Sequence, residues 1–261
     1  MADDPLATLT WLVEAGADEA IGETPVNRLA AKAPPPAPTR AVPRPAPAVA
    51  ASVGADTEHH DIVGTAQTLA AAATSLSELR AAMEGFDGCA LKRTATNTVF
   101  ADGTELAPVM LIGEAPGREE DRVGKPFVGR AGQLLDKMLA SIGLDRAHNA
   151  YITNVINWRP PGNRDPAPDE AAQCLPFLRR HIELAQPTVI ILLGAVAARH
   201  VVGRTDGIMR MRGHWMEYRI GERMVPLMPT LHPAYLLRQP AHKKLAWRDL
   251  QAVRDRLMTL A

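Results

Sequence analysis

Cysteine is scarce in this sequence: Cys89 and Cys174 are the only two among 261 residues. Two thiols cannot form the disulfide framework typical of small secreted domains, so the cysteine content favours a reducing compartment. No apolar run reaches the roughly 18 residues that a transmembrane helix needs, which excludes a membrane span. The first residues, MADDPLATLTWLVEAG, are acidic, whereas a secretory signal peptide begins with positive charge. Together these absences predict a cytoplasmic protein.

The chain also lacks a net charge, because 29 basic residues balance 29 acidic ones. The distribution is uneven, however. Residues 203–261 contain eleven Lys or Arg and five Asp or Glu, a local excess of six positive charges. A locally basic face attracts phosphate groups even when the total charge is zero. Arginines scattered over a solvated surface would give the same count, so charge alone leaves both interpretations open.

Composition divides the chain into three parts. Residues 1–32 contain an amphipathic segment, predicted to be helical, that would dock on the main domain or on a partner. Residues 33–60 are rich in Ala and Pro and bury too little apolar surface to offset their ordering entropy, so an extended linker is predicted. Residues 61–261 are expected to fold as one large domain.

Within this domain, helical and extended patterns alternate. Strands are predicted at 109–112, 151–156, 188–193 and 224–230, and helices at 62–83, 134–142, 168–185, 195–202 and 243–260. Pro226 and Pro229 interrupt the last strand, which places it at an edge of the sheet. The alternation predicts an α/β fold, a three-layer α/β/α domain with a central four-stranded parallel sheet.

The stretch 109–136 organises the rest of the domain. An apolar run ends at Gly113, and GEAPG then forms a sharp loop at the carboxyl end of the strand, the edge where ligands bind in open α/β sheets. A second turn, GKPFVG, leads into a helix whose amino end is suited to face an anion. The segment therefore supplies the carboxylate of Glu114, a bare backbone and the ring of Phe127 to one edge.

Three motifs carry a family resemblance. GEAPGREED with GKPFVGRAGQLLD, then YITNVINWRPPGNR (151–164) and LHPAYLLRQP (231–240), resemble in order and spacing the motifs of the family-4 uracil-DNA glycosylases. The resemblance covers roughly residues 86–257. It implies a uracil-DNA glycosylase-like domain over residues 61–261 that removes uracil from DNA, leaves an abasic site and so initiates base excision repair. The expected partner is uracil-containing DNA, and the protein is expected to be a monomer. Whether other deaminated bases are also substrates is left open by the sequence.

The resemblance assigns four residues to the base. Asn154 presents an amide donor and acceptor side by side, which matches the O4 acceptor and N3–H donor of uracil. Phe127 would stack on the flipped base, and Gly113 would lie beside it. His232 would donate a hydrogen bond to O2 that strengthens as the leaving base becomes anionic. Without the resemblance, a strand cap, core packing and a structural histidine would explain the same residues.

Glu114 is the second catalytic candidate, and it would orient the attacking water or the DNA backbone. Better-known glycosylases of the superfamily have an Asp at the next position, where this chain, like family 4, has Ala115. The Glu114 carboxylate would also stabilise the sugar cation electrostatically. Three further acids follow closely in the sequence and compete for the same role: Glu119, Glu120 and Asp121.

The last motif is expected to enter the DNA. Tyr235, Leu236 and Leu237 would fill the gap that the extruded base leaves, and Arg238 would contact a phosphate or the opposite strand. An apolar run of this kind is also typical of a helix start buried in the core.

The chain departs from family 4 at the iron–sulfur site, where the family binds a [4Fe–4S] cluster through four cysteines. The corresponding positions here are Cys89, Lys92, Trp158 and Cys174. Two thiolates cannot hold such a cluster, so neither a cluster nor any other cofactor or metal is expected. Trp158, with the stem of Lys92, would fill the volume, and both cysteines would remain as reduced, buried remnants.

Two other functions compete with this one. A protein that flips and holds a damaged base without cutting would need the same motifs, and Ala115 in place of Asp keeps that alternative open. A small-molecule nucleotide hydrolase is disfavoured because the sequence has no phosphate-binding loop with its lysine.

Overall fold

The computed structural model describes the backbone of residues 53–260 and side chains from residue 61. The predicted amphipathic segment and residues 33–52 of the predicted linker lie outside this range. Helix α2 (Val53–Ala72) begins within the stretch predicted as linker, so the linker prediction extends too far toward the carboxyl end. In the described part of the chain, no helix combines the length and apolar character needed to cross a membrane.

The single helix predicted over 62–83 is two helices, α2 and α3 (Leu76–Gly85). The break follows from a reciprocal cap. The hydroxyl of Ser75 accepts a hydrogen bond from the Glu78 N–H at 3.2 Å, and the Glu78 carboxylate accepts one from the Thr74 N–H at 2.7 Å. These bonds satisfy free N–H groups at the start of α3, so a new helix begins even where the hydrophobic pattern continues without a break.

The described residues form a six-stranded sheet in the order β1-β3-β2-β4-β6-β5. Its strands are β1 (Asp102–Gly103), β2 (Val109–Gly113), β3 (Ala150–Asn154), β4 (Val189–Leu193), β5 (Met216–Ile220) and β6 (Arg223–Thr230). The four central strands are parallel, as predicted. The sheet as a whole is mixed, because β1 and β5 add antiparallel strands that were not predicted.

The prediction that the fourth strand lies at an edge is wrong. Strand β6 pairs with β4 on one side and with β5 on the other, and Pro226 lies opposite Glu217. Each proline removes one N–H donor but keeps its carbonyl, and the Pro229 carbonyl accepts a hydrogen bond from the Gly213 N–H at 3.1 Å. The alternating burial of β5 fits a solvent-facing edge strand.

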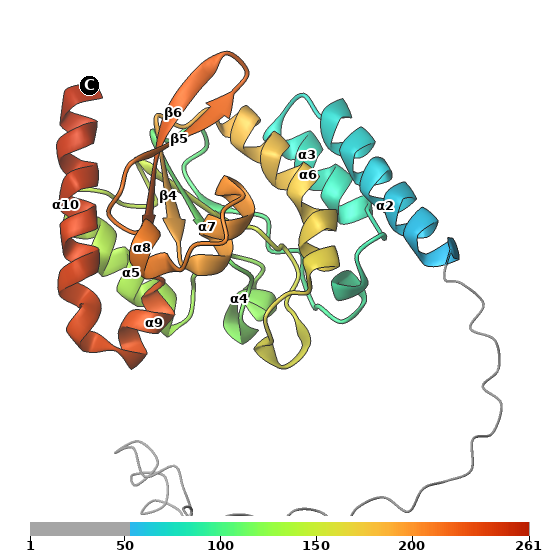
Figure 1. The fold of residues 1–261 in the computed structure, drawn as a ribbon, viewed down its shortest axis with the longest axis horizontal. Helices are drawn as coiled ribbons and strands as arrows, with labels where there is room; N and C mark the ends of the chain where they lie inside the picture. The colour runs from blue at the N-terminus through green and yellow to red at the C-terminus, as the bar shows by residue number, and fades with distance from the viewer. Residues whose placement is uncertain (1–52, 261) are drawn as a thin grey trace, which may run out of the picture. The chain divides into compact units, whose positions relative to one another are not determined.

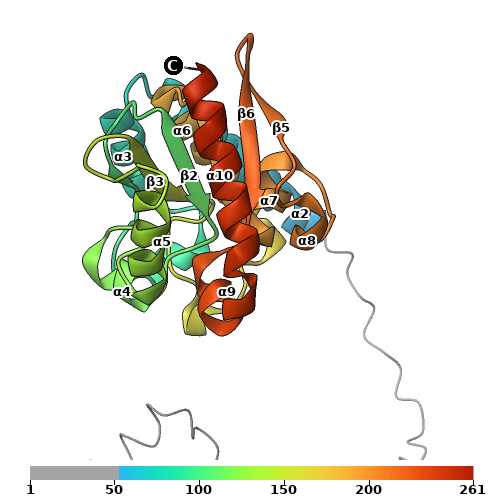
Figure 2. The same ribbon diagram turned by 90° about the vertical axis from the view of Figure 1, so that its left-hand side faces the viewer.

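Helices cover both faces of the sheet (Figures 1 and 2). They are α4 (Arg118–Val123), α5 (Arg130–Ala140), α6 (Pro168–Ala185), α7 (Ala195–Val202), α8 (Ile208–Met211), α9 (Pro233–Arg238) and α10 (Lys243–Leu260), besides α2 and α3. Val109 and Leu111 pack with buried residues of α5 and α10, whereas Met110 and Ile112 pack with those of α2, α3, α6 and α7. This arrangement confirms the three-layer α/β/α prediction.

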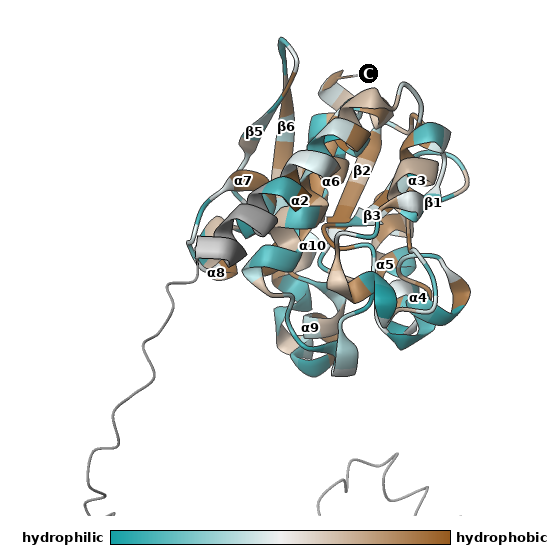
Figure 3. Cartoon of the chain, turned by 90° about the vertical axis from the view of Figure 1, so that its right-hand side faces the viewer, coloured by the Kyte–Doolittle hydropathy of each residue, from teal (hydrophilic) through white to brown (hydrophobic). Residues whose placement is uncertain are grey.

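Because both faces are covered, strands β2, β3 and β4 are buried at every residue. In Figure 3 strand β2 is accordingly hydrophobic along its length, whereas α4, at the edge where the parallel strands end, is largely hydrophilic. At this edge the loops that follow β2, β3 and β6 come together, and they bring the predicted functional residues with them.

Candidate active site

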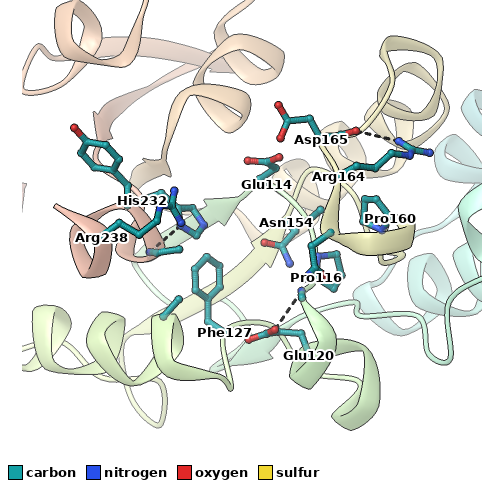
Figure 4. A pocket seen from close by; sticks show the side chains of 16 residues that line it. Glu114, Pro116, Glu120, Phe127, Asn154, Pro160, Arg164, Asp165, His232 and Arg238 are labelled. Atoms are coloured by element: carbon teal, nitrogen blue, oxygen red, sulfur yellow. Dashed lines mark hydrogen bonds between the residues drawn. The ribbon is translucent and has the colours of Figure 1, made fainter. Parts of the chain in front are cut away.

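A cavity of about 420 Å³ opens at the carboxyl edge of the sheet, within the usual range of ligand pockets, about 300–1,000 Å³. Its walls are Glu114, Ala115, Pro116, Gly117, Glu120, Phe127, Ala131, Asn154, Pro160, Asn163, Arg164, Asp165, His232, Ala234, Tyr235 and Arg238. Figure 4 shows Phe127, Asn154, His232 and Glu114 arranged around one common space. Segments far apart in the sequence therefore meet at one site, as the motifs predict.

Asn154 ends strand β3 with an unpaired acceptor. The residue is 2% exposed, and its Oδ1 atom has no hydrogen-bond partner among the described residues. An unsatisfied buried polar group costs about 1–3 kcal/mol, so native proteins rarely keep one without a functional reason. A ligand N–H that reached this oxygen would recover that cost.

Phe127 lies close to Asn154 and has a buried ring. Its centroid is 5.5 Å from that of the His232 imidazole, and the two planes are inclined by 32°. The backbone of Phe127 has a φ of 54°, in the left-handed region that favours glycine. The backbone also runs close under helix α5, where a Cβ on Gly132 would lie 1.7 Å from the Phe127 carbonyl oxygen.

His232 has a defined tautomer. Its Nδ1 atom accepts a hydrogen bond from the Ala234 N–H at 3.1 Å, so the ring proton must sit on Nε2. Burial, helped by repulsion from Arg238, lowers the pKa of His232 to about 4. The imidazole is therefore neutral at physiological pH and offers one N–H donor. The residue also caps the amino end of α9.

Glu114 follows strand β2 and is partly buried. Burial raises the pKa of its carboxyl group, repulsion from Asp165 raises it further, and attraction to Arg199 opposes both. Glu114 and Asp165 line the same cavity, and the charge of Asp165 acts on the Glu114 carboxyl group. A carboxylate with a raised pKa is better suited to accept a proton from water than a fully solvated one.

The three acids that compete with Glu114 have other partners. The Glu120 carboxylate accepts hydrogen bonds from the N–H groups of Gly117, Val128 and Gly129 at 3.1, 3.0 and 2.9 Å, and so ties the two loops that frame the cavity. Asp121 accepts bonds from the backbone of the 96–97 turn, and Glu119 pairs with Arg122 on the surface. Glu120 and Asp121 therefore hold loops in place and Glu119 is engaged at the surface, which leaves Glu114 as the candidate at the cavity.

Helix α9 buries one of the predicted DNA-contacting residues and exposes others. Leu236 is 1% exposed and packs with Leu231 and Ala246, whereas Leu237 is 38% exposed and Arg238 is exposed. The prediction that Leu236 enters the DNA is wrong, because this side chain is buried in the core, whereas Leu237, about 100° further round the helix, is exposed. Tyr235 lines the cavity, and its hydroxyl is 2.7 Å from Nδ1 of His242.

The loop that follows β3 contributes residues that were not assigned from the sequence: Pro160, Asn163, Arg164 and Asp165. Gly162 and Asn163 have φ values of 66° and 53°, which makes a tight turn. Arg164 then forms two hydrogen bonds to Glu170, at 2.8 and 2.6 Å. The motif PPGNR contains the turn residues that signal this loop, but only the fold shows that it closes the cavity.

The residues at the positions where family 4 binds its iron–sulfur cluster do not fit such a cluster. Cys89 and Cys174 are buried and free, and interaction between the two thiols lowers the pKa of Cys89 and raises that of Cys174. Lys92 donates hydrogen bonds to the Glu84 carbonyl at 2.5 Å and to Asp87 at 2.7 Å. Trp158 is 1% exposed. Among the described residues, no group of three or more His, Cys, Asp or Glu is arranged to hold a metal.

Residues 100–251, more than half of the chain, match the family described as Uracil DNA glycosylase superfamily. The chain belongs to this superfamily, which confirms the resemblance and the fold class. It is similar to the Type-4 uracil-DNA glycosylase of Archaeoglobus fulgidus, with 45% identity over 58% of this chain and 78% of that protein. It is also similar to the Type-4 uracil-DNA glycosylase of Sulfurisphaera tokodaii, with 36% identity over 71% of this chain and 86% of that protein. The Type-4 uracil-DNA glycosylase of Thermotoga maritima is 39% identical over 64% of this chain and 86% of its own length.

Proposed function

We propose that this protein is a monofunctional uracil-DNA glycosylase, which hydrolyses the bond between C1′ and N1 of deoxyuridine in DNA and starts base excision repair. The observation that supports this most directly is the unpaired Oδ1 of the buried Asn154, set in a cavity with Phe127 and His232. The enzymes to which the chain is similar are uracil-DNA glycosylases, which favours this function over a lesion-binding protein without activity.

Recognition of the base would combine stacking and hydrogen bonding. The base must first leave the helix, because no side chain reaches the glycosidic bond inside a duplex. The ring of Phe127 would then stack on it, a contact of about 1–3 kcal/mol per base. Oδ1 of Asn154 would accept the N3–H of uracil, and its amide N–H would donate to O4. Cytosine offers the opposite arrangement and would leave Oδ1 unpaired.

Hydrolysis would proceed through a cation-like sugar and an anionic base. As the C1′–N1 bond breaks, its electron pair moves onto uracil, and the Nε2–H of His232 would donate to O2, where negative charge develops. The Glu114 carboxylate would orient a water whose oxygen bonds to C1′, and accept the proton that this water loses. The uracil anion finally takes up a proton from solvent. Among the described residues that line the cavity there is no lysine to attack C1′, so the DNA strand would stay intact.

The exposed side chains of α9 would contact DNA. Both side chains are exposed, and in our proposal Leu237 would replace the extruded base in the stack while Arg238 would meet a phosphate. Tyr235 would line the entrance. We further propose that the enzyme acts as a monomer. A cytoplasmic location is part of the same proposal and rests on the low cysteine content.

We also propose that the enzyme works without an iron–sulfur cluster. The sequence offers two cysteines where four thiolates are needed, and the ion pair of Lys92 with Asp87 takes one ligand position. Trp158 occupies the other ligand position, and its indole N–H donates a hydrogen bond to the Thr98 hydroxyl at 3.0 Å. Purified protein should lack the visible absorbance of such clusters and contain no stoichiometric iron. Iron that persists after chelation, together with that absorbance, would refute the proposal.

The function itself is tested by base release from single- and double-stranded oligonucleotides that contain uracil, hypoxanthine or xanthine. Wild-type protein should release uracil, and Asn154→Ala should lose most of that activity while its melting temperature stays close to wild type. Binding without release, measured by gel shift on the same oligonucleotides, would instead support the lesion-binding alternative. Unchanged release by Asn154→Ala would remove this residue from the site.

A further inference from the structure

Arg146 lies between helix α5 and strand β3, behind the cavity wall rather than in it. Its side chain is 17% exposed. The guanidinium donates one hydrogen bond from Nη1 to the Pro126 carbonyl at 2.9 Å and another from Nη2 to the Phe127 carbonyl at 2.5 Å. These two carbonyls belong to the peptide planes on either side of the Phe127 Cα atom. The rotations of these planes about the N–Cα and Cα–C bonds are the φ and ψ angles of Phe127.

The guanidinium is itself held by two carboxylates. Its Nε atom lies 2.7 Å from Asp136 of α5, and its Nη1 atom lies 3.1 Å from Asp102 of β1. Lys125 also pairs with Asp102, at 2.9 Å. Burial would raise the pKa of Asp102, but the hydrogen bonds and charges of Lys125 and Arg146 outweigh it and lower that pKa, so the pair stays ionised. Arg146 thereby links a strand, a helix and the turn that carries Phe127.

This turn needs support because its conformation is unfavourable. Phe127 has a φ of 54°, and a residue with a Cβ atom in the left-handed region costs about 1–2 kcal/mol relative to the right-handed one. A relaxed backbone would swing the ring away from Gly113, to which it is packed so tightly that an added Cβ would lie 2.6 Å from ring carbons. The position of the ring thus depends on both peptide planes being fixed.

We propose that Arg146 is a positioning residue for base flipping: its guanidinium fork fixes the peptide planes on both sides of Phe127 and so holds the ring where the extruded base stacks. The proposal rests on the stacking role of Phe127 given above. Arginine suits this positioning role and lysine does not. The planar guanidinium presents several N–H groups in a fixed geometry and can bond to both carbonyls, whereas the lysine ammonium is a single compact donor group.

The chain offers a matched control for this substitution. Arg180 also forms two hydrogen bonds to a backbone carbonyl, from Nε and Nη2 to Ala73 at 3.0 and 2.9 Å, and an ion pair with Glu183 at 2.8 Å. It joins α6 to the end of α2 and does not line the cavity. Arg180→Lys therefore removes a comparable set of bonds without touching the turn at Phe127.

The test is a double-mutant cycle of Arg146→Lys and Phe127→Ala, with single-turnover uracil release at saturating DNA as the readout. Arg146→Lys should slow release about tenfold or more in the wild-type background and less than about twofold in the Phe127→Ala background. It should also weaken binding to a duplex that contains 2′-fluoro-2′-deoxyuridine, whose fluorine prevents cleavage. Arg180→Lys should lower the melting temperature by a similar amount and leave release unchanged.

The possible failures are distinguishable. If Arg146→Lys slows release equally in both backgrounds, or if Arg180→Lys slows it as much, Arg146 acts on stability alone and the proposal is overturned. If Phe127→Ala does not impair release, the stacking role is wrong, and the positioning role fails with it. If wild-type protein releases no uracil, the proposed function fails first.

Discussion

The Cα atom of Gly113 lies directly against the amide of Asn154: a Cβ atom built on Gly113 would be 2.4 Å from Oδ1. The same Cβ would be 2.6 Å from the ring of Phe127. The carbonyl of Gly113 also accepts a hydrogen bond from the Val155 N–H at 3.0 Å, so the backbone cannot easily retreat. A single glycine therefore sets the distance between the two residues that would recognise the base.

We expect Gly113→Ala to displace the Asn154 amide, the Phe127 ring or both, and to slow uracil release by about tenfold to a hundredfold, as misplacement of a reacting group by about 1 Å does. Gly64→Ala is the control, since a Cβ at that position has no neighbour within 4 Å. In helix α2 that substitution should stabilise the protein by about 0.5–1 kcal/mol. Release at the wild-type rate by Gly113→Ala would show that the contact with Asn154 is unimportant.

His232 leads to a prediction about pH. Since Nδ1 accepts from Ala234 and the pKa is about 4, the residue should act as a neutral donor over the whole range in which the enzyme works. We expect His232→Ala to slow single-turnover release by about 10²–10³, the usual loss for one donor to a developing anion. The ratio of wild-type to variant rates should be constant between about pH 6 and 8, around the ordinary histidine pKa of about 6.5. A ratio that grows as the pH falls would indicate a protonated imidazole instead.

Much of this site was predictable because the carboxyl ends of parallel strands meet at one edge. The four strands of the parallel core were predicted from short segments rich in apolar residues, and Glu114, Asn154 and His232 lie at or just after the ends of three of them. Such runs occur where both faces of a sheet are covered, so the pattern also indicated the layers. The alternating strand β5 was missed because it is only five residues long, MEYRI, and contains two charges, although the turn at 221–222 separates it from β6.

Other parts depend on tertiary contacts that no local pattern encodes. Glu114 and Glu120 lie close together in the sequence, and only the fold shows that Glu120, in α4, bonds to the backbone at 128 and 129 while Glu114 faces the cavity. Leu236 and Leu237 are adjacent and chemically identical, yet the direction of α9 buries one and exposes the other. Arg146 is separated from Phe127 by 19 residues and belongs to none of the motifs.

Asp165 gives a prediction about the acid limb of the pH profile. Its charge raises the pKa of Glu114, after burial, the larger cause. If ionised Glu114 orients the water, activity falls as the pH drops through that pKa. Asp165→Asn removes the repulsion and lowers the pKa, so the acid limb should move to lower pH. Asp255→Asn removes a charge from an exposed ion pair on α10 and should leave the limb in place. A shift to higher pH for Asp165→Asn would contradict the assignment.

His181 makes folding stability depend on pH. The residue is 1% exposed, its Nε2 lies 2.9 Å from the Tyr151 hydroxyl, and its ring stacks on Phe100 with centroids 4.3 Å apart. Burial lowers its pKa to about 3, whereas in the unfolded chain it is close to 6.5. Below pH 6.5 the unfolded state therefore binds a proton that the folded state does not. The free energy of unfolding is therefore not reduced by His181 above that pH. Below it, the free energy of unfolding falls by up to about 1.4 kcal/mol per pH unit, a total loss of about 2 kcal/mol at pH 5.

Urea unfolding between pH 8 and 5 measures this slope, to which His232 contributes in the same direction because burial lowers its pKa as well. His181→Phe should be less stable at pH 8, since the Tyr151 hydroxyl loses its partner, yet the variant should lose less stability on acidification than the wild type. His148→Gln, at a side chain that is 78% exposed, should keep most of the wild-type slope. An unchanged slope in His181→Phe would mean that the buried imidazole takes up its proton without unfolding the core.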